Sequence, residues 1–447
     1  MSHDDPLTSK TEQRVPEPDA ESRASPADGD EPLPGRRRFL RTGLAAGAAS
    51  VIGMPAGLAD GPGRLPPDVP SWTHRLGPGV ASHPYGSPSP FEKDVARRTL
   101  EWLRPRLESS VSFTPLHGLH GIITPSGLVF ERHHAGIPAI DPHDHRLIIH
   151  GKVERALKFT VQDLMRFPAV SRVHFLECAA NGVLEWRGAQ LNALQFTHGM
   201  LSCCEWTGVP LATLLHEAGL RNGASWILAE GADAAALARS FPVDKALDDA
   251  LVVYAQNGEM LRPEQGYPLR LLLPGWEGIA NVKWLRRLEV GDRPWAMREE
   301  TAAYTDLMPG GKARQFTFVQ EAKSVITWPC PERPVTERGL QIIKGFAWSG
   351  RGRVRNVDVS VDGGRNWRRA RIVGPVYTKA LTRFEIPWQW RGESALLQSR
   401  VVDDSGYVQP TLKQLRGVRG TGSIYHNNAI QTWQVHESGA VENVQLS

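Results

Sequence analysis

The sequence predicts an α+β protein in which a mixed α/β domain is followed by an immunoglobulin-like β-sandwich. Three observations favour this fold class. The 447 residues are enough for two or three domains with real hydrophobic cores. Between residues 145 and 330, apolar runs of strand length alternate with helical patterns. After residue 330, short alternating strands and turn signals follow instead.

Residues 1–59 are predicted to be an acidic leader with a twin-arginine signal peptide. Arg36 and Arg37 precede a Phe-Leu pair and an uncharged stretch of mostly small residues, 43–59. This pattern is typical of twin-arginine export, so we expect a periplasmic protein that is exported already folded. A membrane anchor is the alternative, but the stretch is barely long enough to cross ~30 Å of hydrocarbon. We therefore expect no stable membrane span in the mature chain, and a cofactor inserted before export.

Residues 60–124 are predicted to be an N-terminal arm or linker. The part up to about Pro90 is rich in proline, glycine and serine, which favours an extended chain. Residues 90–107 show a short amphipathic pattern that ends with a proline, and this pattern predicts a helix.

Residues 125–330 carry the mixed α/β pattern. Strands are predicted at 147–150, 173–176, 226–229, 251–254 and 269–273, and helices at 160–165 and 211–218. No GxGxxG or Walker pattern follows any of these strands, so a dinucleotide-binding or NTP-binding fold has no support.

Residues 331–447 carry the sandwich pattern. Residues 353–372 alternate apolar and polar side chains on both sides of Asp362-Gly363-Gly364, which predicts a β-hairpin. Further strands are predicted at 381–386 and 395–402. Strands of this length and spacing are typical of an immunoglobulin-like sandwich.

The net charge of the chain is +4, and the acidic leader hides a more basic mature body of about +6. Such a body suits an anionic substrate, a phosphate-bearing cofactor or an acidic partner only weakly. Nucleic acid is disfavoured, because the sequence has neither a basic block nor an aromatic-basic module.

Cys178 stands directly after a predicted buried strand, among small residues. A lone cysteine at such a place is commonly a small hydrophobic core residue. A thiolate at the open end of a strand also suits a soft metal centre. Composition alone leaves both interpretations open.

Four segments, in the correct order, resemble signature segments of the sulfite oxidase family of molybdopterin enzymes: HFLECAANG, CCEWTGVPLATLLHEAG, YAQNGEMLRPEQGYPLRLLLPGWEGIANVKWL and GFAWSGRGRVRNVDVSVDGGRNW. The resemblance covers about residues 125–440. Within the family, further segments are similar to the molybdenum subunits of sulfane dehydrogenases: GLVFERHH, QFTHGMLSCCEWTG, LQSRVVDDSGYVQPT and YHNNAIQTWQV. The resemblance implies a molybdopterin-binding catalytic domain at 125–330, one molybdenum-molybdopterin per chain, and a self-associating dimerisation domain with a C-terminal tail at 331–447.

The resemblance also implies roles for individual residues. Cys178 would be the thiolate that binds molybdenum, and Arg132 and Arg400 would be active-site arginines. Guanidinium groups suit sulfur oxyanions because they are planar donors that stay charged. For each arginine, and most of all for Arg400, a surface ion pair is the alternative. Tyr304 would hydrogen-bond a molybdenum oxygen, with a plain surface tyrosine as the alternative.

Six further residues are expected to bind the cofactor: His133, His134, Asp233, Gln265, Arg270 and Lys283. Arg270 and Lys283 match positions that hold the pterin phosphate and ring, where cations are required. Gln265 stands where the family has a histidine.

One departure concerns the substrate. The sulfite oxidases have an arginine five residues after the ligand cysteine, whereas this chain has Val183, and the nearest basic substitute is Arg187. The loss of a pocket cation weakens the case for free sulfite as the substrate.

Cys203 and Cys204 are expected near the start of a helix, as packing residues. A disulfide from either of them to Cys330 stays an open possibility. No CxxCH motif is present, so we expect no covalent haem in this chain. By the resemblance, electrons would pass to a separate dihaem c-type cytochrome subunit.

The sequence thus predicts a periplasmic molybdenum oxidoreductase subunit that oxidises sulfane sulfur bound to a sulfur-carrier protein. Two alternatives stay open: a sulfite dehydrogenase that acts on free sulfite, and a cofactor-free binding or assembly module.

Overall fold

A computed structural model describes residues 85–103, 106–422 and 424–446. The acidic leader, the twin-arginine signal and the first part of the arm lie outside the described residues. Residues Ser87–Ser447 belong to one unit by their internal contacts. In the part of the chain that is described, no helix is long and apolar enough to cross a membrane.

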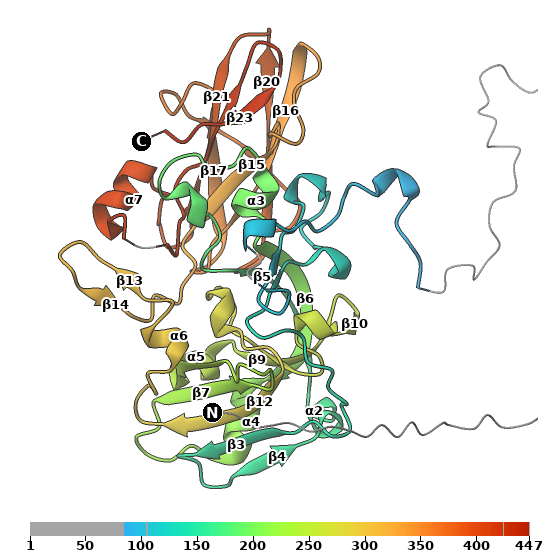
Figure 1. The fold of residues 1–447 in the computed structure, drawn as a ribbon, viewed down its shortest axis with the longest axis vertical. Coiled ribbons are helices and arrows are strands. Elements are labelled where there is room, and N and C mark those ends of the chain that lie inside the picture. Colours follow the sequence, from blue (N-terminus) through green and yellow to red (C-terminus); the bar gives the residue numbers. More distant parts are fainter. Residues whose placement is uncertain (1–84, 104–105, 423, 447) are drawn as a thin grey trace, which may run out of the picture. The chain divides into compact units, whose positions relative to one another are not determined.

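The α/β part is built on two sheets (Figure 1). The first has the strand order β10 (Glu259–Met260), β9 (Leu251–Gln256), β6 (Leu201–Pro210) and β5 (Val170–Glu177), and β11 (Arg270–Leu272) also pairs with β9. The second has the order β4 (Leu157–Phe159), β3 (Leu147–Gly151), β12 (Leu285–Gly291), β7 (Trp226–Gly231) and β8 (Ala238–Pro242). Both sheets are mostly antiparallel, with β3 and β12 as a parallel pair.

Three short helices pack against the second sheet, and each connects a strand of one sheet with a strand of the other: α2 (Val161–Met165), α4 (Leu211–Ala218) and α5 (Val243–Asp248). Thr160 caps α2 with a capping box. Leu214 of α4 and Val243 of α5 share one buried apolar cluster with Ile227 and Leu288 of the sheet. Burial of these apolar side chains is the main force that holds the layer together.

The C-terminal part is a two-sheet β-sandwich. One sheet has the order β15 (Lys323–Trp328), β16 (Gly339–Trp348), β20 (Thr382–Trp390) and β19 (Arg371–Val373). The other has the order β18 (Arg368–Arg369), β17 (Val354–Ser360), β21 (Ala395–Asp403), β22 (Thr432–Val435) and β23 (Val441–Asn443). The sandwich core contains Trp348 and Trp433, and Phe175 of β5 and Cys203 of β6 belong to the same cluster. The core therefore continues from the sandwich into the first α/β sheet.

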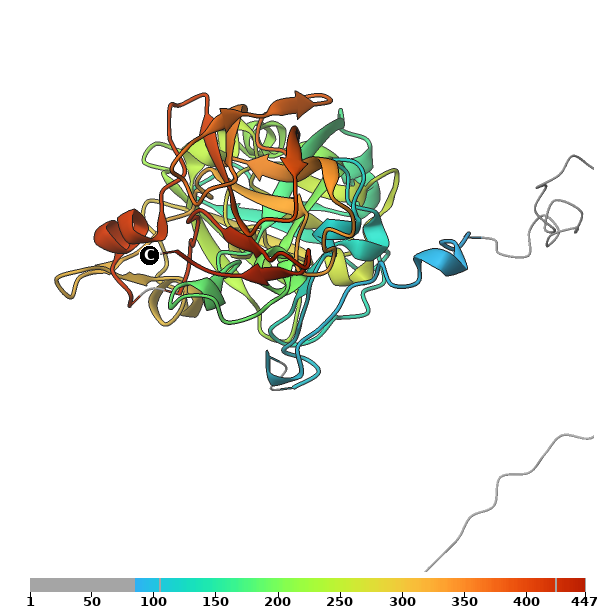
Figure 2. The same ribbon diagram turned by 90° about the horizontal axis from the view of Figure 1, so that it is seen from above.

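A two-stranded hairpin, β13 (Asp306–Leu307) with β14 (Ala313–Arg314), lies beside α7 (Leu412–Arg419) in both views (Figures 1 and 2). A buried ion pair joins the two elements, with 3.1 Å between Arg419 Nη1 and Asp306 Oδ2. Four further short elements are the paired strands β1 (Val111–Ser112) and β2 (Glu131–Arg132) and the helices α3 (Leu194–His198) and α6 (Arg298–Thr301).

Most predicted elements are confirmed: strands are present at or around each of the predicted strand ranges, and the helices at 160–165 and 211–218 are α2 and α4. The predicted helix at 90–107 is wrong, because the described residues of this range, 90–103 and 106–107, form only the 3-10 turns Pro90–Glu92 and Glu101–Leu103. Arg98 instead exchanges backbone hydrogen bonds with Phe113, and the Arg97 guanidinium pairs with Glu131. The segment is thus held against β1 and β2.

Cys203 and Cys204 lie inside strand β6, so their expected place near a helix start is wrong. Both are fully buried, which agrees with their predicted packing role. All four cysteines are free thiols, and no disulfide joins either residue to Cys330.

Candidate active site

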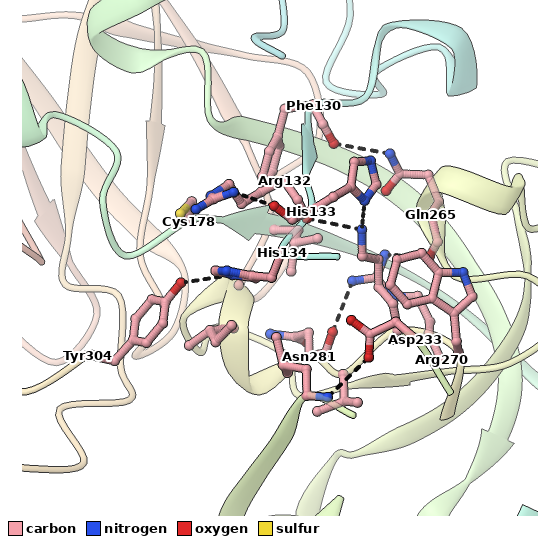
Figure 3. A pocket seen from close by; sticks show the side chains of 17 residues that line it. Phe130, Arg132, His133, His134, Cys178, Asp233, Gln265, Arg270, Asn281 and Tyr304 are labelled. Atoms are coloured by element: carbon pink, nitrogen blue, oxygen red, sulfur yellow. Dashed lines mark hydrogen bonds between the residues drawn. The ribbon is translucent and has the colours of Figure 1, made fainter. Parts of the chain in front are cut away.

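A pocket of about 660 Å³, part of it open to solvent, is lined by residues at the ends of β2 and β5 and by the segment 265–284, which includes β11. It collects nine of the predicted site residues: Arg132, His133, His134, Cys178, Asp233, Gln265, Arg270, Lys283 and Tyr304 (Figure 3). Sequence positions up to 172 residues apart, such as Arg132 and Tyr304, therefore meet in one place.

Cys178 follows β5 directly, and its N–H donates to the Met200 carbonyl at 3.0 Å. Burial raises the pKa of its thiol, and the nearby Arg132 acts in the opposite direction. Among the described residues, no three His, Cys, Asp or Glu side chains converge to hold a metal. The thiolate of Cys178 would be a soft ligand for a metal that a cofactor brings with it.

Gly278 lets the pocket loop pass close to Cys178. A methyl group on Gly278 would lie 3.1 Å from the Glu177 carbonyl oxygen and 3.3 Å from the Cys178 Cα. Both distances are below ordinary contact for carbon, which is about 3.5–4.0 Å. Glycine at this position therefore allows the two backbone segments to pack side by side.

Two cations, the buried Arg270 and the partly buried Lys283, form the opposite side of the pocket. Lys283 Nζ donates to the Arg132 carbonyl at 3.1 Å and the Glu264 carbonyl at 3.0 Å. Arg270 donates to the Gln265 carbonyl at 3.0 Å and the Asn281 carbonyl at 3.3 Å. Neither cation has a carboxylate within ion-pair distance among the described residues. Buried charges without a counter-ion are costly, so this side suits an anion.

The pKa shifts of the two cations have the same cause. Burial lowers the pKa of Lys283 well below its usual value, and the charge of Arg270 lowers it further. Burial also lowers the pKa of Arg270 to about 10. The Nε atom of Arg270 is buried and has no hydrogen-bond partner in the described part of the chain. A phosphate at this place would supply both the missing charge and the missing acceptor.

The two histidines differ in their hydrogen bonds. Since Lys283 Nζ donates to His133 Nδ1 at 2.9 Å, His133 Nε2 carries the proton and faces Glu131 Oε2 at 3.1 Å. Burial lowers the pKa of His133, and it lowers that of His134 to about 4. Both rings are therefore neutral at pH 7 and can act as hydrogen-bonding groups.

Tyr304 closes the end of the pocket near Cys178. Its hydroxyl lies 3.4 Å from His134 Nε2 (Figure 3). Burial raises its pKa well above the usual value, so the phenol keeps its proton. Its backbone φ is 54°, an uncommon value for a residue with a side chain.

Asp233 and Gln265 line the cavity and are tied to its backbone. Asp233 Oδ1 accepts from the Leu237 N–H at 3.1 Å, and Gln265 Nε2 donates to the Phe130 carbonyl at 3.0 Å. These contacts fix the side chains that would meet the polar edges of a ligand.

Arg187 and Arg400 do not line this pocket, which corrects their predicted place. Arg187 is exposed after the turn that follows Cys178. Arg400 lies on β21, with its Nη2 3.5 Å from Asp358 Oδ2 and its guanidinium 4.3 Å from the Trp367 ring centre. For Arg400, the alternative of an ion pair in the sandwich fits these contacts.

The sequence reasoning missed several lining residues: Phe130, Leu176, Leu237, Gly278, Ile279, Asn281, Val282 and Trp284. Asn281 and Trp284 lie in the segment NVKWL, within two residues of Lys283, so their position in the sequence could have indicated that they line the pocket. Lys283 Nζ lies 4.4 Å from the Trp284 ring centre, and the Arg270 guanidinium lies 5.0 Å from that of Trp206. Both contacts lessen the cost of a buried cation.

The residues fit a molybdopterin with a terminal phosphate. Cys178 would hold the metal, Arg270 and Lys283 would hold the phosphate, and the histidines, Gln265 and Asp233 would contact the ring. When bound, the cofactor supplies two-electron redox chemistry and oxygen transfer.

Two family models match the chain: the oxidoreductase molybdopterin binding domain at residues 134–298, and the Mo-co oxidoreductase dimerisation domain at residues 314–433. The fold, the pocket and these matches together define a molybdopterin-dependent oxidoreductase. The mitochondrial sulfite oxidase of Mus musculus is 31% identical over 338 residues, which are 70% of this chain and 62% of that protein. The sulfite oxidase of Gallus gallus is 33% identical over 329 residues, which are 67% of this chain and 71% of that protein. The chain belongs to the sulfite oxidase family.

A solved structure is more similar still. In the crystal structure of the sulfane dehydrogenase SoxCD from Paracoccus pantotrophus, one chain is 52% identical and superposes with a TM-score of 0.84. The match covers 85% of this chain and 98% of that chain. It therefore includes both the pocket and the sandwich.

Proposed function

We propose that this chain is the molybdenum-bearing subunit of a periplasmic enzyme that oxidises sulfane sulfur bound to a carrier protein. The observation that carries the proposal is the likeness to the sulfane dehydrogenase SoxCD over both domains and almost all of the relative's chain. This chain has Val183 at the position where the sulfite oxidases have an arginine, and the loss of this positive charge also favours a substrate other than free sulfite.

The proposed reaction balances with water as the oxygen source. A persulfide on a carrier cysteine, R–S–S⁻, and three water molecules give R–S–SO₃⁻, six protons and six electrons. The electrons require a separate acceptor, which we propose to be a dihaem c-type cytochrome subunit. The two-part name of the related enzyme, SoxCD, is compatible with such a second subunit.

The chain's own residues have three tasks in this reaction. Arg132, at the Cys178 side of the pocket, is a planar donor that would hold the anionic sulfur group. Tyr304 keeps its proton and can donate a hydrogen bond to an oxygen near Cys178. The buried walls, including Leu176 and Trp284, exclude bulk water and strengthen both interactions.

Two further parts of the proposal concern assembly and place. The match to a dimerisation domain supports self-association through the C-terminal sandwich. The twin-arginine pattern supports export to the periplasm. Replacement of Arg36 and Arg37 by lysine, followed by cell fractionation, should leave the protein in the cytoplasm; unchanged export would contradict this part.

The substrate is tested with the purified complex. We expect turnover of a persulfide formed on a single-cysteine carrier protein, with release of six electrons per sulfur, and little turnover of free sulfite. High turnover of sulfite alone would instead support a sulfite dehydrogenase, in agreement with the mouse and chicken relatives.

The metal site is tested with Cys178→Ser and a matched control, Cys330→Ala, in the sandwich core. Removal of a direct ligand should cost more than the 10–100-fold that is typical of outer contacts, so we expect activity to fall more than about 100-fold. The control should keep its molybdenum content and activity. Full molybdenum-dependent activity of Cys178→Ser would refute the assignment.

A further inference from the structure

A buried chain of charged and polar side chains lies behind Tyr304, outside the cofactor pocket. Arg239 of β8 and Glu277 form an ion pair, with 2.5 Å between Arg239 Nη2 and Glu277 Oε1. The other oxygen of Glu277, Oε2, lies 3.2 Å from His426 Nε2. The side chains of all three residues are at most 3% exposed. This series of three side chains thus connects the α/β part with the C-terminal segment after α7.

Arg239 at one end of this series, and Tyr425 next to His426 at the other end, both contact Tyr304. The Arg239 guanidinium lies 5.7 Å from the Tyr304 ring centre. Tyr425, the residue before His426, stacks on the same ring with 4.9 Å between centres and 23° between planes. Tyr304 is therefore held between a cation and an aromatic ring, and the second comes from the C-terminal domain.

The same segment also holds the loop of Cys178. The His426 N–H donates to the Ala179 carbonyl at 2.7 Å. Asn427 Nδ2 donates to the Gly182 carbonyl at 3.1 Å. Three consecutive residues, Tyr425 to Asn427, thus contact the two pocket elements that carry Tyr304 and Cys178.

Two of these residues have a backbone that needs support. The φ angles of Tyr304 and His426 are 54° and 56°, in the left-handed region that disfavours side chains. Such conformations persist where the surroundings hold them, and they gather at functional sites. Buried ion pairs often add no net stability over apolar residues of similar volume, so we attribute the Arg239–Glu277 pair to the geometry that it fixes.

We propose that Arg239, Glu277, Tyr425 and His426 are positioning residues that set the Tyr304 hydroxyl relative to Cys178. The C-terminal domain thereby completes the active site from behind, in addition to its part in association. The proposal deepens the proposed function, on which its kinetic test rests.

The direct test follows Tyr304 itself. The full-length holoenzyme is labelled with 3-fluorotyrosine, and the resonance of Tyr304 among the seven tyrosines is assigned with Tyr304→Phe. We expect Tyr425→Ala to shift and broaden the ¹⁹F signal of Tyr304, because a stacked ring is lost. Tyr425→Phe, which keeps the ring, should leave the signal close to that of the wild type. An unchanged signal in Tyr425→Ala, or an equal change in both variants, would overturn the proposal.

The kinetic test uses the carrier-bound persulfide. For Tyr425→Ala we expect kcat to fall about 10-fold, with KM changed less than about twofold, and rescue by Tyr425→Phe. Equal kcat in wild type and Tyr425→Ala would overturn the proposal. A protein without any persulfide turnover but with the expected ¹⁹F response would refute the proposed function and leave the positioning role standing.

A second variant covers the case in which Tyr425→Ala does not fold. His426→Gln keeps a donor toward Glu277, whereas His426→Ala removes it. We expect the Tyr304 signal to move in His426→Ala and to be largely restored in His426→Gln. Identical signals in both His426 variants and the wild type would overturn the proposal.

Discussion

Arg270 and Arg239 lie on two sides of one active site, and both are 1% exposed. Arg270 has only carbonyl partners and a second cation, Lys283, beside it. Arg239 has a carboxylate, Glu277, and its Nη1 also donates to the Glu299 carbonyl. One side of the site therefore carries an excess of positive charge, while the other is neutralised within the protein.

The difference separates binding from positioning. A buried cation without a counter-ion destabilises the chain until an anion arrives, so the Arg270 side gains its stability from the cofactor. The Arg239 charge is balanced by Glu277 within the protein, so this side needs no anion and can hold neighbouring groups. The four predictions that follow can break or sharpen this contrast, and they run from the largest expected effect to the smallest.

Arg239→Met should be the most damaging change. It leaves Glu277 buried without its cation, which costs about 3–5 kcal/mol of the free energy of unfolding. Urea denaturation of the cofactor-free chain measures it. The double variant Arg239→Met/Glu277→Gln should recover more than half of the loss. A single variant as stable as the wild type would show that the pair is not the neutralising element we describe.

Arg270→Met should behave in the opposite way. The same urea experiment should show a change within about 1 kcal/mol, because a buried charge is removed together with its two hydrogen bonds. Retention of the cofactor during gel filtration should instead fall about 10–100-fold, since a charge-assisted hydrogen bond is lost. If Arg270→Met lost as much stability as Arg239→Met, the proposed difference between the cofactor-binding side and the positioning side would be contradicted.

Lys283 predicts a pH dependence. Burial holds the pKa of Lys283 in the folded chain well below its ordinary value of 10.5. At pH values between the lowered pKa and 10.5, the unfolded chain therefore carries a proton that the folded chain has released. The stability of the cofactor-free chain should therefore rise with pH in this window, by up to about 1.4 kcal/mol per pH unit. Lys283→Met should lack this rise when both chains are unfolded in urea at a series of pH values below 10.5. Parallel curves for the two chains would contradict the prediction.

Arg400→Ala should have the smallest effect. Arg400 is half-buried, pairs loosely with Asp358 and stacks on Trp367, so we expect a loss of at most about 1 kcal/mol of stability. Activity and cofactor content should stay as in the wild type. A drop in kcat of more than tenfold would restore Arg400 to the active site.

The elements with strong local patterns could be predicted from the sequence. Helix α4 ends at the residues that its periodicity predicts, and β5 leads into Cys178 as expected. Arg270 and Lys283, which the resemblance of their segments to the sulfite oxidase family placed at the cofactor, do line the pocket. In these cases the signal lies within a short segment, so neighbours along the chain are enough.

The failures share a cause: the deciding partner is far away in the sequence. The amphipathic pattern at 90–107 does not form a helix, because its Arg97 finds Glu131 instead. The contact between His426 and Glu277, which no motif indicates, joins residues that are 149 positions apart. Local propensity carries no information about such contacts, and tertiary packing overrides it.

Gly278 sets a limit on how this site can evolve. Any side chain there would push the loop away from Cys178 by a few tenths of an ångström, although every ligand and every donor would still be present. The distance between the Cys178 backbone and the segment around Gly278 is thus controlled by a residue that has no reactive side chain. Substitution of Gly278 would shift the position of the Cys178 thiol without changing the metal ligand itself, which makes Gly278 a natural target for directed evolution.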